Sequence, residues 1–235
     1  MQGTVNIDQG TGLAGQLAFD GPVRSVTGVL NSANAAYNII GATAMTWSAE
    51  GILAAGGAAA AFAGILAGGK EYVSFGTSAG GPLAATMVLP NGIVGEAIQM
   101  GEMYVTLPNS ISASIGDLLT YNTTSGTLST IAATAAFTAS QTTTVLTVTA
   151  ITAGNLGVGS VVVQASGNIS RIVSLGTGTG GAGTYNMDTS QTVASGAATA
   201  NSTPSTGSAL VPNAVISRFA VASTTNTLAV AKLTN

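Results

Sequence analysis

The sequence contains no cysteine and no histidine among its 235 residues. Without cysteine there are no disulfides and no thiol nucleophiles, and without both residue types a zinc site of the usual ligands is excluded. A serine–histidine catalytic pair is excluded too. Neither Lys70 nor Lys232 lies in the S-x-x-K motif that a lysine-based alternative would use. We therefore expect no enzyme activity, no cofactor and no metal site in this chain.

The sequence also contains few charged residues. Charged residues make up 6% of the chain, whereas soluble domains average about 25%. No cluster of basic residues could neutralise a run of phosphates, so the sequence argues against nucleic acid and against an anionic membrane surface as partners. A net charge of −3 on a surface rich in Gly, Ser and Thr leaves little repulsion between copies, which favours assembly. The five basic residues are Arg24, Lys70, Arg171, Arg218 and Lys232.

One uncharged stretch, Gly51–Gly69, is about as long as a membrane span. Ala and Gly dominate it and gain little from lipid, and Glu50 precedes it where a positive flank would be expected. We predict a flexible Ala/Gly loop, then a strand over Ala61–Leu66 and a continuing β-like run over Lys70–Phe75, instead of a transmembrane helix. The first ten residues, MQGTVNIDQG, lack the basic and apolar regions of a secretory signal.

The pattern of apolar and polar residues that the sequence does contain is typical of β-strands. Met103, Val105 and Leu107 alternate with polar neighbours over Glu102–Leu107, and this period of two is typical of a half-buried strand. A second strand is predicted over Asp117–Tyr121, followed by a turn that ends at Gly126, a residue suited to positive φ. We expect an all-β protein built around the meander Gly92–Ile131.

An Ala/Thr connector is expected over Ile131–Ala136, and the residue pattern of the chain changes after it. The sequence predicts a series of short strands and a final hairpin. Of the intervening polar segments, Asn201–Gly207 reads as a linker, and Thr189–Ala200 is a polar part of what looks like a self-contained β module. The expected strands are Thr144–Ile151, Val161–Val163 as a buried run, Tyr185–Met187, Val215–Val221 and Leu228–Leu233.

Three patterns could carry chemistry, and each has a plainer structural interpretation that we favour. Glu96 and Glu102 are six residues apart across a glycine-containing stretch and fit solvated strand ends better than a glycosidase pair. The glycine run Gly176–Gly181 has no following lysine or helix pattern, so a tight turn is favoured over a phosphate loop. Calcium could be held only by scattered acids, because none of them lies in a D-x-D-x-D loop; these acids are Asp8, Asp20 and Asp188.

Four short motifs follow each other along the chain, namely Phe62–Leu66 (FAGIL), Gly101–Val105 (GEMYV), Ile115–Tyr121 (IGDLLTY) and Ser125–Leu128 (SGTL). They resemble motifs of tailed-phage structural cement (capsid decoration) proteins. In that family a FAGIL strand, a G-x-x-V-V strand and a GD-x-V-x-Y…TG-x-L hairpin occur in this order. The matching stretches cover roughly 1–131, and the end of the chain, 208–235, is similar to the family's last strands.

Residues 135–200 resemble something different, a small β module that recurs in phage virion structural proteins, often as an insertion. Its signature is the GTGTGG-x-GTY…SQTVAS stretch. The predicted organisation is therefore a cement-like β core with an N-terminal arm from 1–134 plus 208–235, an outward-protruding inserted module from 135–200, and a linker from 201–207. For the arm, Met1–Val29, ordering only on a partner and forming an edge strand or loop of the core both remain open.

The resemblance implies a compact β-barrel or jelly-roll-like core on the outer surface of a phage capsid. The partners would be the major capsid protein, neighbouring cement subunits and two further copies in a homotrimer, and the function would be to stabilise the head. The alternative is a tail- or fibre-type adhesin whose module at 135–200 binds the host surface. Aromatic side chains are the candidate interface anchors, namely Trp47, Phe62, Tyr72, Phe75, Tyr104 and Phe219.

Overall fold

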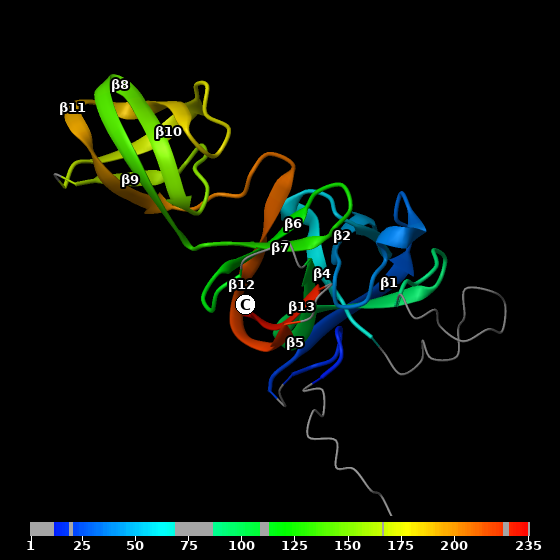
Figure 1. Ribbon diagram of the computed structural model, residues 1–235. Coiled ribbons are helices and arrows are strands. Elements are labelled where there is room, and N and C mark those ends of the chain that lie inside the picture. Colours follow the sequence, from blue (N-terminus) through cyan, green and yellow to red (C-terminus); the bar gives the residue numbers. More distant parts are fainter. Residues whose placement is uncertain are drawn as a thin grey trace, which may run out of the picture.

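The computed structural model describes residues 12–18, 21–68, 87–108, 113–165, 167–222 and 226–234. The protein is nearly all β, with 62% of residues in strands and 3% in helix, which confirms the predicted fold class. The strands form a nine-stranded and a four-stranded sheet, and Figure 1 shows them as two bodies joined by a thin neck. No helix among the described residues is long and apolar enough to cross a membrane.

The first part of the chain forms a closed five-stranded barrel. Its strands follow each other in the order β1-β3-β2-β4-β5, and β1 pairs with β5 to close the ring. The barrel interior holds a cluster of fully or nearly buried apolar side chains that includes Leu30, Met45 and Leu53. The barrel strands are β1 (Arg24–Leu30), β2 (Ala44–Ala49), β3 (Ile52–Ala55), β4 (Phe62–Leu66) and β5 (Val94–Pro108).

The long strand β5 belongs to the barrel and to the second half of the same sheet. Beyond Met100 it pairs with β13 instead of β1, and the sheet continues in the order β5-β13-β12-β6-β7. Met103, Val105 and Leu107 are fully buried in a second apolar cluster under this half, which confirms the alternation predicted for Glu102–Leu107. The further strands are β6 (Leu118–Asn122), β7 (Leu128–Ile131), β12 (Ser208–Ala222) and β13 (Asn226–Leu233).

The turn between β6 and β7 connects this half of the sheet to the barrel. Gly126 has a φ of +72°, as predicted, and its carbonyl accepts a hydrogen bond from the Ala44 N–H at 2.8 Å. The Gly57 N–H donates to the Thr123 carbonyl at 2.7 Å, and the Tyr121 hydroxyl donates to the Gly57 carbonyl at 3.2 Å. These three hydrogen bonds therefore join the β6–β7 hairpin to β2 and to the loop after β3.

Residues 12–18 lie along β5. Gly15 donates its N–H to the Tyr104 carbonyl, Ala18 donates to the Glu102 carbonyl, and Tyr104 donates back to Gln16, all at 2.8–2.9 Å. This part of the N-terminal region is therefore an edge segment paired with the chain's own sheet. The arm hypothesis does not hold for it, because β5 already supplies the backbone partners that an external protein would have provided. The first eleven residues lie outside the described part of the chain.

The four-stranded sheet forms a small module of its own, called the β8–β11 module below. Its strands run in the order β10-β9-β11-β8, and β10 also pairs with β11. A separate apolar cluster that includes Phe137, Leu146 and Tyr185 lies inside it. Its strands are β8 (Thr134–Ala153), β9 (Val161–Gln164), β10 (Ile169–Leu175) and β11 (Gly183–Asn201).

Two sequence-based expectations were wrong in this region and in the barrel, and one polar stretch for which the sequence predicted no particular element forms a strand. The connector Ile131–Ala136 is already part of β8 from Thr134, and the polar stretch Thr189–Ala200 is the second half of β11. These two stretches pair with each other from Thr134↔Asn201 to Ala139↔Gly196, so each supplies the backbone partners of the other. The Ala/Gly loop expected before Ala61 contains β3, which is held by β1 and β2.

The neck between the two bodies is a pair of adjacent chain segments. The Ser202 N–H donates to the Ala133 carbonyl at 3.1 Å, directly after the Thr134↔Asn201 pair of the module. Ile131 pairs with Leu118 at one end of β6, whereas Ser208 pairs with Asn122 at the other end. The segment 202–207 therefore runs back along β6 before β12 begins, and Figure 1 shows this return in orange.

Candidate binding surfaces

Among the described residues, no group of three or more His, Cys, Asp or Glu could hold a metal ion. Glu102 forms an ion pair with Arg218 at 3.7 Å. Glu96 is half-buried and lies opposite Thr27 on β1. Asp188 accepts hydrogen bonds from the Arg171 N–H and the Thr189 hydroxyl, and these bonds lower the pKa of its carboxyl group. Asp8 and Asp20 lie outside the described residues.

The glycine run on the module surrounds a tyrosine. The Tyr185 hydroxyl donates to the Gly181 carbonyl at 2.6 Å and accepts from the Gly180 N–H at 3.1 Å. Burial of the ring raises the pKa of Tyr185, partly offset by the Gly180 bond. A Cβ atom on Gly178 would lie 2.4 Å from the Tyr185 ring. Gly178 is thus needed for the close approach of the loop to this ring, which agrees with the turn interpretation favoured from the sequence.

Replacing Gly178 with valine should therefore destabilise the module, by about 2–4 kcal/mol, because the loop must move off the ring and both hydrogen bonds to the hydroxyl weaken. Gly181→Val is the matched control in the same loop, since a Cβ there meets nothing within 4 Å. Thermal unfolding followed by near-ultraviolet circular dichroism at the tyrosine band measures the difference. Equal melting temperatures for the two variants would contradict the packing argument.

The six aromatic candidates do not gather on one described surface. Trp47 in β2 is half-buried against the barrel core, and Phe62 in β4 packs on the second cluster with its ring 6.1 Å from that of Tyr121. Tyr104 in β5 is half-buried, and a Cβ on Gly12 would collide with its ring. Its ring is therefore covered in part by the chain's own N-terminal segment. Tyr72, Phe75 and the side chain of Phe219 lie outside the described part of the molecule.

The module instead exposes aliphatic side chains that the sequence did not predict to be exposed. The run Val161–Val163 was expected to be buried, but only Val162 is, whereas Val161 and Val163 are 42% and 40% exposed. The reason is that β9 has only one face on the module interior, so its alternate residues point outward. Together with Ile169 and Val173 on the adjacent strand β10, they form what we call the aliphatic face.

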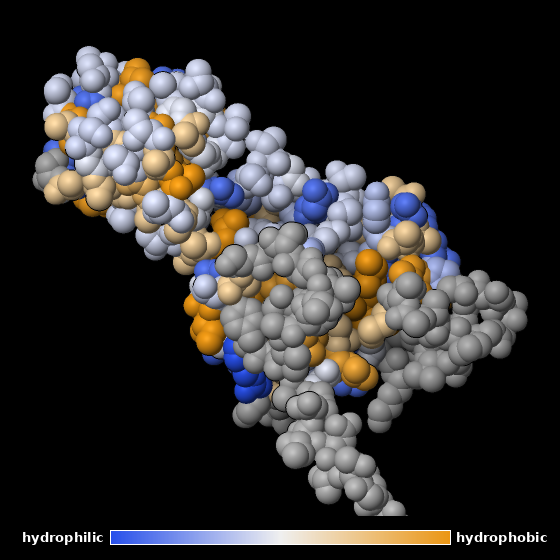
Figure 2. All heavy atoms as spheres, in the orientation of Figure 1, coloured by the Kyte–Doolittle hydropathy of each residue, from blue (hydrophilic) through white to orange (hydrophobic). Residues whose placement is uncertain are grey.

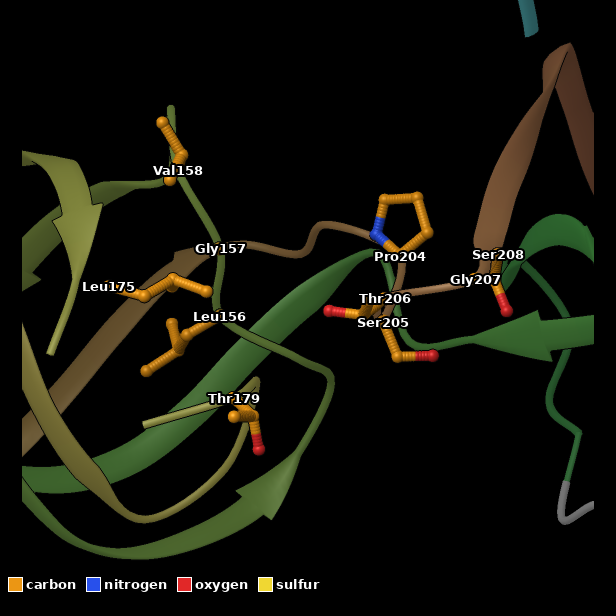
Figure 3. A pocket seen from close by; sticks show the side chains of 10 residues that line it. All are labelled: Leu156, Gly157, Val158, Leu175, Thr179, Pro204, Ser205, Thr206, Gly207 and Ser208. Carbon is orange, nitrogen blue, oxygen red and sulfur yellow. The ribbon is translucent and has the colours of Figure 1, made fainter. Parts of the chain in front are cut away.

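A cleft of about 270 Å³ lies where the module meets the return segment 202–207. Figure 3 shows Leu156 and Leu175 on the module side and Pro204 on the opposite side. The rest of the lining consists of glycine, serine, threonine and one valine. No group that titrates near neutral pH lines this cleft, so its serine and threonine hydroxyls have no general base among the lining residues to activate them.

The visible surface of the molecule is weakly polar. Figure 2 shows most of the module in pale shades, with a few strongly hydrophilic residues and scattered apolar ones between them. This agrees with the composition, because residues 134–201 contain a single basic residue, Arg171, and a single acidic one, Asp188. Such a surface supports contacts made by burial and hydrogen bonding in preference to ion pairs.

The fold and these surfaces define an all-β protein with a closed barrel, a second small β module and largely uncharged outer faces. The chain belongs to the structural cement protein family (E217 gp24/Pam3 gp6), whose model matches residues 1–166. This match covers the barrel strands, the β6–β7 hairpin and the first two strands of the module. A search of curated proteins found no match. The family implies a structural, non-enzymatic role in a phage capsid.

Proposed function

We propose that this protein binds the lattice of the major capsid protein on the outer surface of a phage head and stabilises it against internal pressure. The family match is the observation that carries the proposal. The surface chemistry supports it, because uncharged, hydroxyl-rich faces can pack against other protein surfaces without a large desolvation cost for charges. Many modest contacts made by many copies add to a strong total effect on the shell.

The arrangement of the neck supports separate roles for the core and for the β8–β11 module. We propose that 1–134 and 208–235 form the part that binds the capsid, in a homotrimer whose copies also contact neighbouring cement subunits. Residues 135–200 then form an inserted module that points away from the shell, joined through the linker 201–207. Both chain crossings of the neck lie side by side at Ala133 and Ser202, as expected of an insertion into a surface loop.

The contact residues on the core remain a proposal. Trp47 and Phe62 are half-buried and can bury further area on a partner, which is the behaviour of aromatic anchors at interfaces. Tyr104 would require the segment 12–18 to move. The other three aromatic candidates, Tyr72, Phe75 and Phe219, are proposed on the sequence alone.

Attachment to the capsid should survive high salt. Because the chain has so few charges, raising NaCl from about 0.05 to 1 M reduces the Debye length from above 10 Å to about 3 Å without removing a major source of affinity. We expect less than a threefold change in the protein bound per particle, measured by sedimentation of particles followed by quantitative gel analysis. Release by salt alone would contradict the proposed contact chemistry.

The number of copies per particle tests the function itself. Hundreds of copies distributed over the head are expected of a cement protein, and imaging of the particle should place them on the capsid exterior. A few copies located at the tail tip would support the alternative, a tail- or fibre-type adhesin, and would overturn the proposal.

A further inference from the structure

The β8–β11 module holds both chain crossings of the neck, from Ala133 in one and up to Thr203 in the other. The Ser202 N–H donates to the Ala133 carbonyl at 3.1 Å, and the Thr203 N–H donates to the Asn155 carbonyl at 3.0 Å. A Cβ atom on Gly154 would lie 2.2 Å from the Ser202 hydroxyl oxygen, so the loop after β8 lies close against the return segment. This part of the neck therefore moves with the module.

The core holds the same two crossings at separate places. Ile131 is the last residue of β7, which pairs with β6 along its length. In the return crossing, the Thr123 N–H and hydroxyl both donate to the Gly207 carbonyl, at 2.8 and 3.0 Å. The N–H of Ser208, the first residue of β12, donates to the Ser205 carbonyl at 3.0 Å. This part of the return segment therefore moves with the core.

One residue in each crossing, Ala132 and Pro204, lies between the parts that the two bodies hold. A body joined to another at two such points turns about the line between them, because other movements would pull one crossing away from its hydrogen-bond partners. The ring of Pro204 fixes its φ, and it also keeps the residue before it in an extended conformation. The neck thus has the geometry of a hinge with a restricted range.

The cleft of about 270 Å³ lies beside this hinge. Its module side carries Val158 and Leu175, which are 59% and 39% exposed, and its other side is formed by residues 204–208. Figure 3 shows Leu175 and Thr206 on opposite sides of the cleft. A turn that narrows the cleft removes apolar surface of both aliphatic side chains from water, which favours the closed form.

We propose that the module turns as a rigid body about Ala132 and Pro204, and that this turn closes the cleft by packing Val158 and Leu175 against residues 204–208. The open and closed forms then differ in the direction in which the module points from the core. The hinge is a property of the free protein. Its test therefore needs no capsid, and its failure would leave the proposed function untouched.

Spin labels on engineered cysteines measure this motion in the full-length protein, because the chain has no native cysteine. Val173 is exposed on β10 two residues from Leu175, and Thr124 is exposed in the β6–β7 turn beside Thr123. Labels at Val173 and Thr124 therefore lie on either side of the cleft, and closure shortens the distance between them. A second label pair at Val173 and Thr147, both exposed on the module, is the rigid control.

Double electron–electron resonance should give a short and a long distance for the pair across the cleft, with a total width at least about twice that of the control pair. Leu175→Ser should reduce the short-distance fraction about threefold, because closure then buries less apolar surface. Val161→Ser is the matched variant, since Val161 is 42% exposed on β9 but does not line the cleft, and it should leave the fraction unchanged. Pro204→Gly should widen the distribution further, because φ is then no longer fixed.

Two results would overturn the proposal. One is a distance across the cleft as narrow as that of the control pair, which would mean a rigid neck. The other is the same distribution for Leu175→Ser and Val161→Ser, which would mean that the cleft side chains do not drive closure. An unchanged distance for the control pair shows that each variant module is folded. Val158→Ser repeats the test at a second cleft residue and should act like Leu175→Ser.

Discussion

Replacing Gly126 with alanine is expected to lower the free energy of unfolding of the core by about 3–4 kcal/mol. Gly126 has a φ of +72°, and alanine at positive φ costs about 1–2 kcal/mol. In addition, the new Cβ would lie 2.5 Å from the Ala44 carbonyl oxygen and 2.7 Å from the Gly56 nitrogen. Both are backbone atoms of the barrel, so relieving the overlap must separate the β6–β7 turn from the barrel.

Gly92→Ala is the matched control, because Gly92 has a similar φ of +88° but open space around the position of a Cβ. The Gly92→Ala variant should lower the free energy of unfolding by about 1 kcal/mol, through the strain of its backbone conformation alone. Trp47 is the only tryptophan and lies in the barrel strand β2, so its fluorescence reports unfolding of the core separately from the module. For a chain of this size we expect the Gly126 variant to melt about 6–12 °C lower than the wild type. Equal shifts for the two variants would show that the turn and the barrel are not coupled.

The parts of the fold that the sequence predicted are those with one buried face of large side chains. Met103, Val105 and Leu107 alternate strongly with polar neighbours because the interior position is filled by bulky apolar groups, and the strand and its register follow from that contrast. Gly126 was predictable because a short hairpin turn requires a residue that accepts positive φ.

The second half of β11 escaped prediction for the opposite reason. Its inward residues, Ala198 and Ala200, are small, so their hydropathy differs little from that of the outward residues Ala197 and Thr199 beside them, and no period of two stands out. β3 and the edge segment 12–18 depend on contacts with residues far away in the chain, such as the pairing of Leu30 with Leu53. Local patterns do not contain that information.

For the functional surfaces, the motifs in Phe62–Leu66 and Ile115–Tyr121 were enough to predict the family, which the family match confirmed. The aliphatic face was missed because a run of three valines reads as a buried strand, and only the pairing of β9 with β10 shows which of them face outward. A sequence pattern shows how the side chains of a strand alternate between its two faces. It does not show whether both faces are buried against other parts of the chain.

Deleting the module should leave the core folded and bound to the capsid, provided that the return segment 202–207 is kept. Ala133 and Ser202 are hydrogen-bonded neighbours, so a variant that joins them through two glycines needs no rearrangement of β6, β7 or β12. Its Trp47 melting transition should lie within about 1 kcal/mol of the wild type, consistent with a surface loop change. Binding to capsids that lack the protein should change less than threefold.

A deletion that joins Ile131 directly to Ser208 is the informative control. These residues pair with opposite ends of β6, at Leu118 and Asn122, so they are separated by about 13 Å along the strand and by about two strand spacings across it. One peptide link spans about 3.8 Å, and the shortened chain must break the β6 ladder. This variant should lose several kcal/mol of core stability and its capsid binding. If the first deletion also lost binding while its Trp47 transition stayed intact, the module itself would contact the shell, and the proposed outward orientation would be wrong.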